Sequence, residues 1–149
     1  MKFRATTISL TLVLLFGCQS KHDPRLDGEW QSNREDTVAE AFRRFPEMKK
    51  RTPDQIEKFK DIFGHMILRF AGNQVTMEFH DEIGEFTYKV KESGENFVVI
   101  NTSGAIGDGA ETRIEFEEDF DAYWIDTGFD YPEKFDKKEA EPAGTGQPM

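Results

Sequence analysis

Two short strands and the turn between them are contained in one stretch of the chain, MILRFAGNQVTMEF, residues 66–79. In each half of this stretch, every second residue is a bulky apolar one: Met66, Leu68 and Phe70, then Val75, Met77 and Phe79. A period of two places alternate side chains on opposite faces of a strand. Residues 71–73, Ala-Gly-Asn, supply the turn. The stretch therefore predicts an antiparallel hairpin with one buried face.

The same period continues toward the C-terminus. We expect further half-buried strands at 86–90, 97–100, 112–116 and 122–125, and an aromatic segment at 129–135 that closes the sheet. Gly104, Gly107 and Gly109 indicate a flexible loop within this region. Strands that recur about every ten residues favour an antiparallel up-and-down meander that curls into a barrel or half-barrel.

Before the hairpin, the period changes to that of a helix. A first strand is expected at 26–32, after which apolar residues recur at helical spacing over 38–45 until Pro46. A second helix begins at Thr52, where the sequence TPDQ combines a capping box with proline at the first helical position, and it ends at Gly64. We expect a two-helix insertion over 36–64 that covers one mouth of the barrel.

The expected fold class is mainly β within the α+β class, with one domain over 26–136. A length of 149 residues favours a single domain, and 37% hydrophobic with 32% charged residues excludes wholesale disorder and a polytopic membrane protein. Residues 137–149 are rich in Lys, Glu, Pro and Gly, which predicts a disordered tail.

The first residues have the pattern of an export signal. A basic start, MKFR at 1–4, precedes an apolar run from Ile8 to Phe16 that is too short to span a bilayer as a mature helix. The run ends at Gly17, directly before Cys18, which is the single cysteine of the chain. The sequence therefore predicts a signal peptide over 1–17.

The residues around the cysteine, Leu15-Phe16-Gly17-Cys18, resemble the lipobox of bacterial lipoproteins. The resemblance implies cleavage before Cys18, a diacylglycerol on its thiol, and a tether over 18–25 that anchors the domain durably in the cell envelope. Because Gln19 rather than Asp follows the cysteine, it also implies sorting to the outer membrane. The alternatives are a plain secretory signal and a buried thiol.

Two further resemblances concern the domain. Gly28-x-Trp30 on the first strand, followed by a meander, resembles the lipocalin (calycin) pattern, in which the Trp closes the barrel floor. Residues 26–135 are similar to small uncharacterised bacterial lipoproteins through Trp30-x-Ser32, Thr52-Pro53-x-Gln55, Phe63-Gly64 and Tyr123-Trp124, among other short matches. These resemblances imply a lipocalin-like architecture and an envelope location, and they leave the function open.

Aromatic residues on the alternate positions of the strands are expected to line the barrel. The candidates for the lining are Trp30, Phe79, Phe86, Tyr88, Phe116 and Trp124. A barrel of about eight strands is just wide enough for side chains to fill or for one ligand to occupy. Bulky residues on every strand favour a filled interior, with any pocket smaller than roughly 300 Å³. Trp30 is expected to be buried near the strand that carries Tyr123.

Residues that could carry out chemistry do not converge in the sequence. His22, His65 and His80 have no partner at the spacing of metal ligands. The turn at 80–82 and the acidic run at 115–121 could meet a divalent cation, but solvated turns explain both better. Ser103 lacks the Gly-x-Ser-x-Gly setting of a nucleophile. We therefore expect no metal, no other cofactor and no enzymatic activity.

The net charge of −10 argues against a nucleic-acid partner, because phosphate binding needs clustered Lys and Arg. We expect a non-catalytic, lipid-anchored envelope protein that acts as a binding or accessory module. Its partners would be the membrane, through Cys18, and an envelope protein or a small apolar ligand. The first alternative is a carrier of a small apolar ligand in the barrel, and the second is an enzyme of unknown class.

Overall fold

The computed structural model describes residues 22–104, 109–126 and 130–139. The expectations for the signal peptide at 1–17 and for Cys18 lie outside these ranges, as do Gly107 and residues 140–149 of the tail. In the described ranges, no helix is both long enough and apolar enough to cross a membrane.

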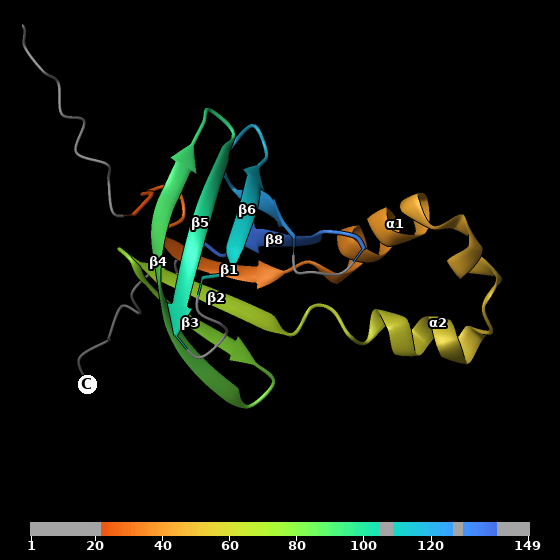
Figure 1. Cartoon of the computed structure of the whole chain (residues 1–149). Coiled ribbons are helices and arrows are strands. Elements are labelled where there is room, and N and C mark those ends of the chain that lie inside the picture. Colours follow the sequence, from red (N-terminus) through yellow and green to blue (C-terminus); the bar gives the residue numbers. More distant parts are fainter. Residues whose placement is uncertain (1–21, 105–108, 127–129, 140–149) are drawn as a thin grey trace, which may run out of the picture.

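The described residues form a closed barrel of eight antiparallel strands, in which neighbours in sequence pair and β8 returns to β1 (Figure 1). The up-and-down barrel that the alternation predicts is thus confirmed. The strands are β1 (Gly28–Ser32), β2 (Met66–Ala71), β3 (Gln74–Phe79), β4 (Glu82–Ser93), β5 (Phe97–Gly104), β6 (Glu111–Phe116), β7 (Ala122–Ile125) and β8 (Glu133–Lys137).

The hairpin predicted from residues 66–79 consists of β2 and β3. Leu68 lies opposite Met77, and Phe70 lies opposite Val75, so the apolar residues of both strands share the inner face. Gly72 has a φ of 60° at the turn, a conformation that glycine adopts without steric cost. The turn residues and the alternation therefore specify the same register.

Large side chains fill the barrel. Trp30, Tyr88, Tyr123 and Phe135 are fully buried, and they pack in one cluster with Leu26 and residues from the four other strands. The ring centroids of Trp30 and Tyr123 are 4.5 Å apart, which confirms the expected burial of Trp30 beside this strand. The barrel interior is therefore a packed core.

Most of the expected lining residues belong to this core. Trp30, Tyr88 and Phe116 are buried in it, and Phe86 packs against it. Phe79 shares the inner face of β3 with Val75, but it lies at the end of the strand and is half-buried.

The prediction that Trp124 lines the barrel is wrong. Tyr123 lies opposite Phe116 and is fully buried, so the next residue, Trp124, lies opposite Glu115 on the outer face. The run Ala122-Tyr123-Trp124-Ile125 contains no charged residue. Alternation therefore could not indicate which of its faces is buried.

A helical lobe, defined here as residues 33–64, connects β1 to β2 and projects beyond the ends of these strands (Figure 1). It contains α1 (Arg34–Arg44), a 3₁₀ helix η1 (Pro46–Lys50) and α2 (Pro53–Lys60). The first helix begins two residues earlier than expected because the Asn33 side chain caps it by accepting from the Asp36 backbone N–H. The capping box predicted at Thr52 and Gln55 is present.

The helical lobe has a hydrophobic core of its own. Val38, Ala41, Met48, Phe59 and Phe63 form this second cluster, and Tyr131 from the β7–β8 connection packs against it. The expectation that the helices bury their apolar stripes over a barrel mouth is therefore wrong. The aromatic residues of the two stripes instead pack against one another and against Tyr131.

Buried polar groups join the lobe to the barrel. The Ser32 hydroxyl donates to the Glu133 carboxylate and accepts from the Gly64 backbone N–H at 3.0 Å. Burial raises the pKa of Glu133. The fully buried Tyr123 hydroxyl has no hydrogen-bond partner among the residues described, and burial raises the pKa of its phenol.

The part of the expected tether that is described, residues 22–25, lies at the end of the barrel away from the helical lobe (Figure 1). The Arg25 guanidinium donates to the Asp23 carboxylate and to the backbone carbonyls of Gly94 and Glu95, at 2.9 and 2.7 Å. The Asp23 backbone N–H donates to the Tyr88 hydroxyl at 3.2 Å. The chain is thus fixed to the barrel from Asp23 onward, earlier than the expected boundary at 26.

The last strand also extends past its expected boundary. Lys137, assigned by the sequence to the tail, belongs to β8, and the Lys138 backbone N–H donates to the Glu29 carbonyl at 2.9 Å. Backbone pairing with β1 orders these residues despite their polar side chains.

Candidate functional site

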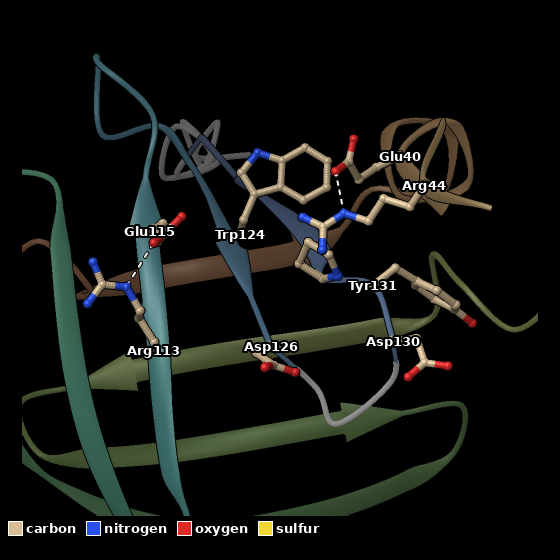
Figure 2. A pocket seen from close by; sticks show the side chains of 9 residues that line it. Glu40, Arg44, Arg113, Glu115, Trp124, Asp126, Asp130 and Tyr131 are labelled. Carbon is tan, nitrogen blue, oxygen red and sulfur yellow. Dashed lines mark hydrogen bonds and ion pairs between the residues drawn. The ribbon is translucent and has the colours of Figure 1, made fainter. Parts of the chain in front are cut away.

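A surface groove of about 490 Å³ lies between the helical lobe and the outer face of β6 and β7 (Figure 2). We call it the outer groove. Its lining consists of Glu40, Arg44, Arg113, Glu115, Trp124, Asp126, Asp130, Tyr131 and Pro132. A second hollow of about 620 Å³ lies where residues 22–25 meet 90–95. Both exceed the expected limit of roughly 300 Å³, and both are lined by residues outside the barrel core.

Trp124 supplies the indole of the outer groove. Because side chains alternate between the two faces of β7, the Trp124 side chain lies on the outer face. It points toward Glu40 and Arg44 of α1 (Figure 2). The indole N–H donates to the Glu117 carboxylate at 3.2 Å, and the Lys134 ammonium lies 5.9 Å from the ring centroid. These contacts hold the ring in place at the wall of the groove.

Charged side chains form the walls of the groove. Arg44 is paired with Glu40 at 2.7 Å, and Arg113 is paired with Glu115 at 2.8 Å (Figure 2). A hydrogen bond from Arg43, together with one from Arg44, lowers the pKa of Glu40 to about 2. The lining contains four carboxylates and two guanidinium groups, so the groove carries a net negative charge.

Tyr131 connects the groove to the helical lobe. Its ring meets the rings of Phe59 and Phe63 edge-on, with centroids 5.7 and 5.9 Å away, and it meets Phe45 at 6.4 Å. Burial raises the pKa of this phenol. The lobe and the β7–β8 connection therefore position the groove wall together.

The groove combines an aromatic ring with paired charges. Within residues 22–104, 109–126 and 130–139, no group of three or more His, Cys, Asp and Glu side chains is placed to hold a metal ion. An aromatic ring beside paired charges can accept an apolar side chain and a neighbouring cationic or hydrogen-bonding group.

The sequence prediction found little of this groove. Trp124 is the one candidate lining residue that belongs to it, and it does so from the face opposite to the expected one. Glu40 and Arg44 are visible in the sequence as an i,i+4 pair, but such pairs are common on exposed helices. No pattern in the sequence marks Arg113 or Asp130 as a groove residue, because only strand pairing and the helical lobe place them beside the other lining residues.

The structure brings together two of the histidines, which have no partner at the sequence spacing of metal ligands. His65 and His80 lie side by side, with ring centroids 4.5 Å apart. Met66 pairs with Phe79 at the end of the β2–β3 ladder, and the next opposed positions are His65 and His80. The register of the hairpin thus brings together two residues that are fifteen apart in sequence.

No protein-family model, curated protein or solved structure matches this chain. Its function is therefore inferred from its own residues.

Proposed function

We propose that this chain is a non-catalytic, lipid-anchored accessory protein of the bacterial cell envelope, with the barrel as a scaffold and the outer groove as the binding site for a protein partner. The observation that carries the proposal is the position of the groove. It lies outside a packed barrel and exposes an indole between charged walls.

The packed interior argues against a carrier. Ordinary ligand sites begin at roughly 300 Å³ and bury most of the ligand surface. The centre of this barrel is occupied by Trp30, Tyr88, Tyr123 and Phe135, each of them fully buried. An apolar ligand would have to displace these rings.

The composition of the outer groove supports a protein partner. Trp, Tyr and Arg are enriched at the energetically important positions of protein interfaces. The groove contains Trp124, Tyr131, Arg44 and Arg113 within one concave surface. Its net negative charge would favour a partner segment that carries Lys or Arg, chiefly through faster association and the exclusion of acidic partners.

The position of residues 22–25 supports an anchored orientation. Asp23 is five residue steps from Cys18, and each step spans at most about 3.5 Å, so the barrel end at Asp23 would stay within roughly 18 Å of the lipidated cysteine. The helical lobe projects from the other end of the barrel (Figure 1). Anchoring through Cys18 would therefore direct the lobe and its groove wall away from the membrane.

The proposal can be tested by site-specific photo-crosslinking in intact membranes. A photoreactive residue in place of Asp130, on the groove wall, should capture one envelope protein reproducibly. The same residue in place of Lys89, an exposed position on β4 outside the groove, is the matched control. We expect the adduct at 130 to disappear in a Trp124→Ala background and to be absent at 89.

Two results would contradict the proposal. One is an adduct that forms equally from both positions and is insensitive to Trp124→Ala. The other is a lipid that co-purifies with the protein at one molecule per chain, which would favour the carrier.

A further inference from the structure

His65 and His80 form an exposed pair of imidazoles that the proposed function does not use. Their rings are 4.5 Å apart between centroids and inclined by 31°. His65 is half-buried and His80 is exposed, so solvent reaches the pair. Neither residue lines the outer groove.

The backbone at His80 is unusual. Phe79 pairs with Glu82, so His80 and Asp81 make a two-residue hairpin turn, and His80 has a φ of 53°. A positive φ is uncommon for a residue other than glycine, although Asn, Asp and His adopt it more often than the rest. Here the conformation places the His80 ring beside His65.

The positively charged side chain of Arg34 already contacts one ring nitrogen of the pair. The Arg34 Nη2 atom lies 3.2 Å from Nε2 of His65. A guanidinium group can only donate, so Nε2 must be the accepting nitrogen, and the proton of the neutral ring resides on Nδ1. The lone pair that Arg34 contacts is the one that a metal ion would use.

Arg34 has other partners that could hold it when it moves. Its Nε donates to the Phe63 backbone carbonyl at 3.0 Å, and its Nη1 lies 3.7 Å from the Asp61 carboxylate. The guanidinium can thus leave His65 without losing every compensating contact.

We propose that His65 and His80 bind a divalent transition-metal ion of the Cu²⁺ or Zn²⁺ class through their imidazole nitrogens, and that this ion displaces the Arg34 guanidinium from His65. Imidazole is a preferred ligand for these ions. Since no third His, Cys, Asp or Glu completes a cluster in the described part of the chain, water fills the remaining coordination positions. The metal ion would thus replace the Arg34 guanidinium as the positively charged group beside Nε2 of His65.

The test uses the untagged full chain and Cu²⁺ as the probe. Electron paramagnetic resonance should show two nitrogen ligands, and a competition titration should give the affinity. His65→Gln and His80→Asn should each weaken binding by at least about tenfold, since removing even outer-shell partners of a metal site has effects of that size. Asn tolerates the left-handed backbone at position 80, so the second variant keeps the turn.

Two further variants sharpen the test. His22→Gln, in the segment before β1, is the matched control and should leave the affinity unchanged. Arg34→Met should tighten binding by at least about threefold, because the competing cation is gone. Cu²⁺ that binds His80→Asn as tightly as the wild type, or a spectrum with oxygen ligands alone, would overturn the site. An unchanged or weaker affinity in Arg34→Met would overturn the displacement.

Discussion

The Trp30 indole packs against the Tyr123 phenol ring with centroids 4.5 Å apart, and both side chains are fully buried. The indole N–H donates to the Leu26 carbonyl at 2.6 Å, while the Tyr123 ring stacks on Phe135 at 5.4 Å. This contact links β1, β7 and β8, the strands through which the barrel closes. We therefore expect the stability of the closed barrel to depend more on Trp30 than on any exposed aromatic residue.

Replacing Trp30 by Ala should lower the free energy of unfolding by about 3–5 kcal/mol, because the substitution leaves a large cavity beside Tyr123. Such a loss is a large part of the total stability of an ordinary domain. Urea denaturation followed by circular dichroism measures the change. Trp124→Ala is the matched control, since it removes the same side chain from the outer face and should cost much less. Equal losses in the two variants would contradict the assigned roles.

The buried carboxyl of Glu133 should make stability depend on pH. Burial raises its pKa above the usual 4.5, so the folded state holds this proton more tightly than the unfolded state. Its contribution is fully present below pH 4.5 and is lost as the pH rises through the raised folded-state value. Glu133→Gln should therefore be more stable than the wild type at neutral pH and similar to it under acid conditions. Urea midpoints across this pH range measure the difference.

Glu40 provides a control for this prediction, because its pKa is shifted in the opposite direction. Hydrogen bonds from Arg43 and Arg44 lower its pKa to about 2 from the usual 4.5. Its contribution is present above pH 4.5 and is lost as the pH falls toward 2. Glu40→Gln should destabilise the protein slightly at neutral pH, because an exposed ion pair is screened by solvent. A stabilising effect of Glu40→Gln, or a destabilising one of Glu133→Gln at neutral pH, would contradict these assignments.

The sequence predicted the barrel wherever polar and apolar residues alternate cleanly. Residues 66–79 do so, and their hairpin has the predicted register. The prediction failed at 122–125, because a run without charged residues has no marked outer face. It also failed for the cover over the barrel mouth, since an apolar helical stripe shows that a face is buried but does not identify its partner.

The candidate sites were harder to predict than the fold. The outer groove combines residues from α1, β6, β7 and the segment before β8, which only the closed barrel brings together. The His65–His80 pair depends on the hairpin register extending one position beyond Met66 and Phe79. Both sites depend on which strands pair. The spacing of residues along the sequence indicates little of the outer groove beyond the Glu40–Arg44 pair, and it indicates the His65–His80 pair only indirectly.

Membrane attachment should depend on Cys18. Removal of its thiol by Cys18→Ser leaves no atom for the diacylglycerol, so the protein should leave the membrane fraction or accumulate with its signal peptide uncleaved. Fractionation followed by mass spectrometry of the mature N-terminus measures both outcomes. Ser20→Ala, in the same segment, should change neither. Normal processing and continued membrane attachment of the Cys18→Ser variant would contradict the lipoprotein proposal.

The helical lobe should open separately from the barrel. Its core is distinct from the barrel core, and Phe59 is buried in it between Phe63 and Tyr131. A segment with its own small core can unfold locally at a lower free energy than the whole domain. Phe59→Ala should therefore raise amide hydrogen exchange throughout α1 and α2 and leave the protection of β2 to β5 unchanged. Phe116→Ala, a matched substitution in the barrel core, should raise exchange in the strands as well. If Phe59→Ala weakened protection in the lobe and the barrel alike, the two cores would belong to one cooperative unit, and the wall of the outer groove at Tyr131 would be as rigid as the barrel itself.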